Sequence, residues 1–317
     1  MTLYCLKIKL ISTILAAAAV IVAQHDNTAP LTKPPLANNL DYLENGLQTL
    51  PQTTYTLSQW TNGQIPQDCY DIAHTEGRNP TDFLVYAVTY TDCVDPWYFC
   101  YHKNTEITID SMAYQWGKLP IQMRQWVKHV VTMPAPTGQA YALNGNTVFF
   151  HPNDHLQTEI THETGHLLDG LGAYGYFMST SDNWWNNYNL DSNVPDPYSQ
   201  TDSSEDVAQN TVVALFNNNI FGGFGTVEPN YSKVIHQYMT LLTAAADSGQ
   251  DTSLFSPGQN LQCRIRLPNS PSVIASNGAT PSPIQGDVED TSLKQCVPIV
   301  PINQNFTTKG SCKLAWE

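Results

Sequence analysis

The pattern of apolar and polar residues predicts a strand and a hairpin in the first half of the chain. The run DFLVYAVTY, residues 82–90, is rich in β-branched and aromatic residues, which predicts a strand. In AYALNGNTVFF, residues 140–150, the dipeptide Asn144-Gly145 separates two apolar runs. This arrangement is typical of a hairpin with a two-residue turn.

Two further segments are defined by helical spacing or by its loss. Residues 111–133 carry apolar residues at helical spacing, interrupted at Pro120. They predict a kinked helix, or a loop followed by a helix from Ile121. Residues 171–202 are rich in Tyr, Trp, Asn and Asp. They predict a long irregular loop.

Helices are also predicted on both sides of this loop. In the first of them, Asp154 is a candidate N-cap and Gly170 marks the end. In the second, Ser203 and Asp206 stand at the spacing of a capping box. The predicted helices cover residues 154–170, 203–219 and 231–246. A strand, a helix, a hairpin and then several helices indicate the α+β class.

The ends of the chain differ from its middle. Residues 1–23 combine Lys7 and Lys9 with a short apolar run, which predicts a secretory signal peptide rather than a membrane anchor or a buried helix. The apolar run is shorter than the roughly 20 residues that a membrane span needs. We predict an extended arm or removable pro-segment at 24–60, a catalytic domain at 61–246 and an irregular, cysteine-containing extension at 247–317.

The charge of the chain limits its partners. The sequence has 28 acidic residues against 14 basic ones, a formal charge of −14. Loss of residues 1–23 removes two lysines and no acid, which changes this charge to −16. Nucleic acids and anionic membranes attract basic surfaces, so neither is expected as a partner.

The cysteines predict disulfides and an oxidising compartment. Seven are present, and Cys5 would leave with the signal peptide. The remaining six are Cys69, Cys93, Cys100, Cys263, Cys296 and Cys312. Three precede residues 161–170 and three follow them, so complete internal pairing requires at least one bridge between the two groups. We expect Cys93–Cys100, with Cys69 bound to one of the last three cysteines. Glycosylation sequons at Asn230 and Asn305 also fit export.

The stretch THETGHLLDG, residues 161–170, contains the pattern His-Glu-x-x-His. On a helix, His162 and His166 lie one turn apart on the same face and can bind one metal ion. Glu163 lies about 100° round the helix, within reach of a water on that metal. Zn²⁺ lowers the pKa of such a water to about 7, so that Glu163 could act as a general base. The alternative is an ordinary surface helix that carries two histidines.

A catalytic zinc site needs a third protein ligand. A histidine six residues after His166 would serve, but that position is Gly172. Glu205 is a better candidate, because it lies just inside the start of the predicted helix at 203–219. A carboxylate there can turn toward the first helix and complete a set of His, His and Glu.

This region resembles the anthrax lethal factor type of zinc metalloprotease, a gluzincin. The pattern Tyr-x-x-Thr-Asn-x-x-Glu-x-x-Ala-Glu of that family is similar to Tyr198, Thr201, Asp202, Glu205, Ala208 and Gln209. Residues 162–169 are similar to its His-Glu-Phe-Gly-His-x-x-Asp run, with Asp169 at the matching place. Asp202 replaces the usual Asn, and Gln209 replaces the second Glu.

The resemblance implies a zincin-like fold with a small mixed sheet, an active-site helix and further helices. It implies that Glu205 is the third ligand of a single Zn²⁺ ion and that Tyr198 stabilises the tetrahedral intermediate. Asp169 and Gln209 would form hydrogen bonds to the metal ligands without binding the metal themselves. A second resemblance, carried by CVDPWYFC at 93–100, is to secreted conidiation-specific proteins of filamentous fungi.

These observations predict a secreted zinc metallopeptidase that is monomeric and cleaves peptides or proteins. Its strand from Asn146 to Phe150 is expected to offer its edge to an extended substrate. One alternative is a secreted zinc-binding protein or surface antigen that keeps the metal site but does not hydrolyse peptides. Another is a structural wall or spore-coat protein with a relict site.

Overall fold

The computed structural model describes residues 25–136, 138–150, 156–247, 254–256, 263 and 266–281. Its strands are β1 (Tyr55–Gln59), β2 (Gln64–Pro66), β3 (Phe83–Tyr90), β4 (Trp97–His102), β5 (His129–Met133), β6 (Gln139–Leu143), β7 (Asn146–Phe150) and β8 (Ser272–Ile274). Its α-helices are α1 (Glu44–Leu47), α2 (Gln67–Thr75), α3 (Ile109–Trp116), α4 (Ile121–Arg124), α5 (Leu156–Gly170), α6 (Asp182–Leu190), α7 (Ser203–Asn219) and α8 (Ile235–Asp247). The predicted α+β class is confirmed.

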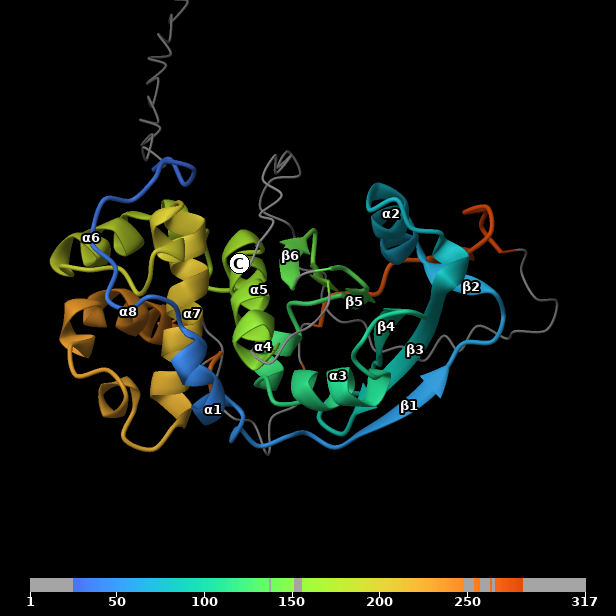
Figure 1. Ribbon diagram of the computed structural model, residues 1–317, viewed down its shortest axis with the longest axis horizontal. Helices are drawn as coiled ribbons and strands as arrows, with labels where there is room; N and C mark the ends of the chain where they lie inside the picture. The colour runs from blue at the N-terminus through green and yellow to red at the C-terminus, as the bar shows by residue number, and fades with distance from the viewer. Residues whose placement is uncertain are drawn as a thin grey trace, which may run out of the picture.

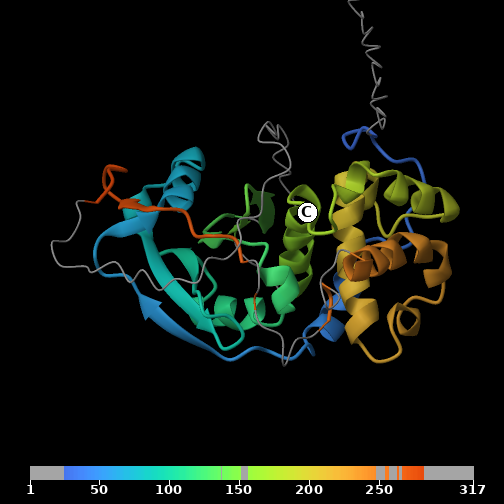
Figure 2. The ribbon, with the colours of Figure 1, turned by 180° about the vertical axis from the view of Figure 1, so that it is seen from behind.

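Six strands form one mixed sheet in the order β1-β3-β4-β5-β7-β6, and β2 pairs with β8 in a small second sheet. In the large sheet β5 runs parallel to β4 and β7, while the other neighbours are antiparallel. Both ribbon views place α5 between this sheet and a group formed by α6, α7 and α8 (Figures 1 and 2). Within the described residues no helix combines the length and the apolar character that crossing a membrane requires.

Alternation along the strands places apolar side chains on both faces of the large sheet. Val130 and Phe149 belong to the core that includes α3, α5 and α7, whereas Val131 and Val148 belong to a second core that includes α2 and β8. Successive side chains of a strand point to opposite faces, so the strands from β3 to β7 contribute to both cores, whereas β1 contributes only to the first. The central strands of the sheet are therefore buried on both sides.

This burial explains why the prediction for residues 129–133 was wrong. These residues form β5 rather than the end of a helix, and all five are buried. A strand covered on both faces has a continuous apolar run without the alternation that identifies a half-buried strand. The helical part of the predicted segment is divided into α3 and α4, with Pro120 at the N-cap of α4.

The strand at 82–90 and the hairpin at 140–150 are confirmed as β3, β6 and β7. Asn144 and Gly145 have φ values of 50° and 89°, as the tight turn requires. However, β7 does not have a free edge, because it pairs with β5 on one side and β6 on the other. The expected edge for a peptide is therefore wrong for Asn146–Phe150, and β6 is the terminal strand of the sheet.

The predicted loop at 171–202 contains a helix. In α6, Trp184 and Tyr188 are buried one turn apart, and the Ser181 hydroxyl caps the helix by accepting from the amide of Trp184. The many Asn and Asp residues of this segment concealed the helical spacing of its two buried aromatic residues. The helices predicted around 203–219 and 231–246 are confirmed as α7 and α8. The predicted N-cap Asp154 lies outside the described residues.

The disulfides differ from the expected pairing. Cys69 is bound to Cys100, and Cys93 is bound to Cys263. Cys93 packs in the core on the α5 side of the sheet and Cys100 in the core on the α2 side, so the expected Cys93–Cys100 bridge would have to cross the sheet. The bridge required between the two groups of cysteines is confirmed as Cys93–Cys263. Cys296, Cys312, Asn305 and residues 1–23 lie outside the described residues.

The described part of the N-terminal arm packs against the rest of the protein. Leu43 and Leu47 are fully buried in the core that includes α5 and α7. At the end of the arm, β1 pairs with β3 as the other terminal strand of the large sheet. Removal of the arm from a mature form stays a prediction, as do the domain limits.

Candidate metal centre

The close approach of α5 and α7 brings the predicted ligands together. Gly165 lies between the two histidines of α5 and faces α7. A Cβ atom at this position would lie 3.0 Å from the Thr211 side chain and 3.1 Å from Cα of Ala208. Any other residue at 165 would push the helices apart, so this glycine allows a side chain of α7 to reach the histidines.

The start of α5 is held by the N-terminal arm. The buried Glu44 carboxylate accepts hydrogen bonds from the amides of Gln157 and Thr158 at 3.1 and 2.8 Å and from the Thr158 hydroxyl at 2.7 Å. Amides in the first turn of a helix have no partner within the helix, and an acidic group there is favoured by the helix dipole. A carboxylate distant in sequence therefore caps the helix that carries the histidines.

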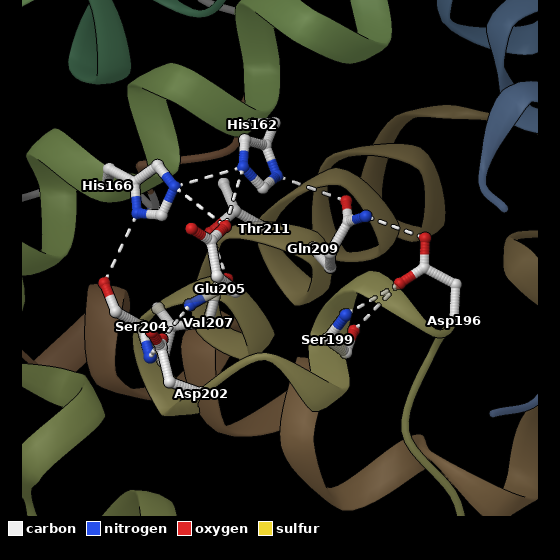
Figure 3. A network of polar contacts seen from close by, with 10 residues as sticks. All are labelled: His162, His166, Asp196, Ser199, Asp202, Ser204, Glu205, Val207, Gln209 and Thr211. Carbon is white, nitrogen blue, oxygen red and sulfur yellow. Dashed lines mark hydrogen bonds and ion pairs between the residues drawn. The ribbon is translucent and has the colours of Figure 1, made fainter. Parts of the chain in front are cut away.

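His162, His166 and Glu205 converge on one point (Figure 3). Nε2 of His162 lies 3.0 Å from Nε2 of His166, and each of these atoms lies 3.2 Å from Oε2 of Glu205. In a tetrahedral zinc site with bonds of about 2.0–2.1 Å, neighbouring ligand atoms are separated by roughly 3.3 Å. The triangle formed by these atoms thus has the dimensions of one face of a zinc tetrahedron.

The tautomer of His162 follows from a chain of hydrogen bonds. Nε2 of Gln209 donates to Asp196 Oδ2 at 2.7 Å, so the amide oxygen of Gln209 faces Nδ1 of His162 at 3.2 Å. Since this oxygen can only accept, Nδ1 must carry the proton. Neutral His162 therefore presents the lone pair of Nε2 to His166 and Glu205, which is the form that binds a metal.

His166 has a similar support in α7. Its Nδ1 lies 3.3 Å from the Ser204 hydroxyl, which can accept a proton from it (Figure 3). Burial opposes the charged form of this histidine, but the Glu205 carboxylate outweighs burial and raises the pKa of His166 to about 9. A proton on His166 is therefore the competitor of a metal ion at this site.

Glu205 is fully buried between the two histidines, and its Oε1 accepts no hydrogen bond from the described residues. Burial opposes its ionisation, yet the imidazoles of His166 and His162 hold the pKa of Glu205 well below its usual range. A buried carboxylate with a free oxygen beside two imidazole nitrogens is a set of donors that suits Zn²⁺. The residues present thus fit this metal.

The N-cap of α7 is Asp202 rather than the predicted Ser203. Oδ1 of Asp202 accepts from the amides of Ser204 and Glu205 at 2.8 and 2.9 Å. Asp and Asn are about equally good N-caps. The replacement of the usual Asn at position 202 therefore keeps the feature that orients Glu205 at the start of the helix.

Glu163 is buried beside the ligands, with 1% of its surface exposed. Neither of its carboxylate oxygens has a hydrogen-bond partner among the described residues. Burial raises the pKa of Glu163 to about 8. A carboxyl group of this kind is available to accept and release a proton.

The other predicted site residues, Tyr198, Asp169 and Gln209, differ in their burial and in their contacts with the two histidines. The ring of Tyr198 is half-buried and its centre lies 5.6 Å from that of His162. Asp169 is buried but accepts from the amide of Ser179 at 3.0 Å. It therefore anchors the segment that leads to α6, and no hydrogen bond joins it to a ligand in the described structure. Gln209 does bond to His162, through its side-chain oxygen.

Sequence reasoning missed residues that hold the ligands in place. Glu44 bonds to the start of α5, Asp196 to Gln209, and Ser204 to His166. Ser204 alone had a signal in the sequence, because it adjoins Glu205. Asp196 reaches Gln209 from 13 residues before it, and Glu44 reaches α5 from 113 residues away. Neither pair has a spacing that any helix or strand pattern reveals.

We expect Gln209→Ala to weaken zinc binding by about 10- to 100-fold. Loss of a residue that hydrogen-bonds to a metal ligand, here His162, has effects of this size. Gln209→Glu should not restore it, since a carboxylate at 209 would face Asp196 where the amide now donates at 2.7 Å. Competition with a chromophoric chelator measures both affinities.

Asn218→Ala, an exposed change on the same helix, is the control. Equal affinity of Gln209→Ala and the control would contradict a supporting role for Gln209.

Two comparisons with known proteins gave a match. Residues 37–251 match the model of a family described as "Conidiation-specific protein Con-13". The curated protein "Conidiation-specific protein 13" of Neurospora crassa is 35% identical over 173 residues, which cover 53% of this chain and 51% of the relative. The chain thus spans about half the length of the curated relative it matches. Neither description names a metal, a reaction or a substrate.

No solved structure matches the chain. The resemblance to conidiation-specific proteins, first suggested by residues 93–100, is confirmed over a far longer segment. Since the family model covers the whole region from α1 through the metal centre to α8, the chain belongs to the Con-13 family of conidiation-specific proteins.

Proposed function

We propose that this chain is a secreted zinc metallopeptidase of the gluzincin type, in which one Zn²⁺ ion is held by His162, His166 and Glu205. The observation that carries the proposal is the triangle of ligand atoms, with sides of 3.0, 3.2 and 3.2 Å. Two imidazole nitrogens and a carboxylate oxygen repel one another at these distances unless a proton or a metal ion lies between them, and a zinc ion would replace the proton of His166. The set leaves the fourth position of a tetrahedron open, as a catalytic zinc requires.

The geometry also supports a role for Glu163 in hydrolysis. Bound Zn²⁺ supplies a Lewis acid that acidifies water and polarises a carbonyl group. Glu163 takes a proton from the attacking water on a carboxylate oxygen and delivers it to the nitrogen of the leaving amine. Its two oxygens are free for this task because no described residue bonds to them.

Tyr198 is the proposed donor to the oxyanion of the tetrahedral intermediate. Its ring lies beside that of His162, and it belongs to the short 3-10 helix Tyr198–Gln200. Ser199 in the same turn donates from its amide to Asp196, which in turn accepts from Gln209. One polar network therefore supports both the ligand His162 and the turn that carries Tyr198 (Figure 3).

Export is supported by the disulfides and the N-terminal sequence. The bridges Cys69–Cys100 and Cys93–Cys263 suit an oxidising compartment. The basic and then apolar pattern of residues 1–23 is typical of a signal peptide. We therefore propose that the protein works outside the cell or in the cell wall, as a monomer acting on peptides or proteins.

Metal analysis of the full-length exported protein, combined with a peptide-library assay, tests this function. We expect one zinc per chain, cleavage of a subset of peptides, loss of cleavage with a chelator, and recovery on addition of Zn²⁺. One bound zinc without cleavage of any peptide would favour the alternative, a zinc-binding protein or surface antigen. Absence of bound zinc after incubation with the metal would contradict both functions.

A further inference from the structure

A cavity lies among α6, α8 and the segment that precedes α6. It has a volume of about 830 Å³, within the range of small-molecule sites. Its lining includes Tyr174, Tyr176, Asn187, His236 and Thr240. None of these residues belongs to the metal centre, and α7 separates α8 from α5 in both ribbon views (Figures 1 and 2). The cavity is therefore distinct from the site of the proposed hydrolysis.

Several polar groups that line the cavity already donate their hydrogen atoms to other groups of the protein. What they can offer a ligand is therefore an acceptor atom. The hydroxyls of Thr240 and Thr243 donate to the carbonyls of His236 and Met239, at 2.6 and 2.9 Å. Nδ2 of Asn187 donates to both the backbone carbonyl and the side-chain oxygen of Asn183, one turn earlier in α6. The side-chain oxygen of Asn187 and the lone pairs of both threonine hydroxyls remain available.

His236 adds a further polar group. Its Nδ1 lies 2.8 Å from Oδ1 of Asp191, whose side chain is fully buried and also accepts from the amide of Gln237. A carboxylate accepts from Nδ1–H, and the Nε2 side of the ring is turned away from Asp191. The His236 side chain is 45% exposed, which allows this nitrogen to contact a ligand.

The cavity combines these polar groups with apolar surface. Its described lining contains no Lys, Arg, Asp or Glu. Tyr176 is 38% exposed and offers both a ring face and a hydroxyl, because that hydroxyl accepts from Asn183 and keeps its own hydrogen to donate. A charged ligand would lose its hydration here without gaining a counter-charge.

We propose that this cavity binds an uncharged carbohydrate. Several hydroxyl donors on one ligand match several fixed acceptors, and the apolar face of a sugar ring suits the faces of Tyr176 and Met239. Since both side chains are substantially exposed, the site can accommodate one part of a longer saccharide whose remainder extends into solvent. The site would hold the protein on a glycan while the metal centre acts elsewhere.

Isothermal titration calorimetry of the full-length exported protein tests this site. The probes are two neutral tetrasaccharides, of β-linked glucose and of β-linked N-acetylglucosamine, and one cation, Nα-acetylarginine amide. We expect saturable binding of at least one tetrasaccharide and none of the cation. Loss of neutral hydrogen bonds in Asn187→Ala should weaken this binding roughly 3- to 10-fold, and Tyr176→Ala should weaken it as well.

Asn186→Ala is the matched control, because it changes the same residue type on the same helix outside the cavity. Tyr176→Ala alters an exposed side chain, so it keeps the test informative if Asn187→Ala does not fold. The proposal is overturned if neither sugar binds up to about 10 mM, roughly ten times a millimolar dissociation constant. It is also overturned if only the cation binds, or if neither cavity variant differs from Asn186→Ala.

Discussion

The Glu163→Gln variant is expected to bind one zinc ion per chain and to lose peptide cleavage by about 10²- to 10⁴-fold, the usual contribution of a general base. The substitution would keep the size of the side chain in a site where only 1% of Glu163 is exposed. It would remove the group that accepts the proton. The ligand atoms belong to other residues, so their triangle should persist. Zinc content is measured by elemental analysis, and cleavage with a peptide identified from the library.

Glu106→Gln is a suitable control for the same chemical change, because Glu106 is exposed and far along the chain from the centre. It should leave both zinc content and cleavage unchanged. Two results would refute the role of Glu163. Cleavage at the normal rate in Glu163→Gln would show that another group takes the proton. Loss of zinc together with cleavage would show that Glu163 binds or positions the metal instead.

The convergence of His162, His166 and Glu205 could be predicted because these three residues follow local rules. His162 and His166 are one helical turn apart, and Glu205 lies near an N-cap that holds the first turn of α7. The distance between the two helices could not be predicted from periodicity. It depends on Gly165, whose missing side chain permits contact with Thr211 and Ala208. That contact joins residues more than 40 positions apart, so no local pattern contains it.

The elements that were missed are those in which tertiary contacts override the local pattern. In β5, burial on both faces removes alternation, so an apolar run that continues a helical pattern forms a strand instead. In α6, two aromatic residues buried one turn apart stabilise a helix of poor formers. The pairing of Cys93 with Cys263 likewise depends on which face of the sheet each cysteine occupies.

At position 209 this chain has Gln where the lethal factor pattern has Glu, and Asp196 supplies the missing negative charge. A glutamate there would supply negative charge directly behind His162. In this chain the neutral Gln209 bonds to His162, and the charge lies one residue further out, on Asp196. The histidine is therefore oriented as a carboxylate would orient it. The sequence alone left this role open because Asp196 has no fixed spacing from the motif.

Glu205→Gln is expected to weaken zinc binding by more than about 100-fold. That factor is the upper limit for loss of a residue that only hydrogen-bonds to a metal ligand, and Glu205 is a proposed ligand itself. The substitution keeps the shape of a fully buried side chain but removes its negative charge. At a zinc concentration 100 times its dissociation constant, the native protein should gain about 2.7 kcal/mol of unfolding free energy. The variant should gain almost nothing at that concentration. Chelator competition and thermal unfolding with and without Zn²⁺ measure the two effects.

Asp206→Asn provides a matched control, since it makes the same kind of change at the next buried position of α7. Asp206 bonds to Gln237 and Asn210 rather than to the histidines, and burial raises its pKa well above the ordinary value. It therefore contributes little charge that a metal could use. If Asp206→Asn binds zinc normally and Glu205→Gln does not, the loss comes from the ligand and not from disturbance of the helix. Equal zinc affinity in Glu205→Gln and the native protein would mean that the third ligand is a different residue.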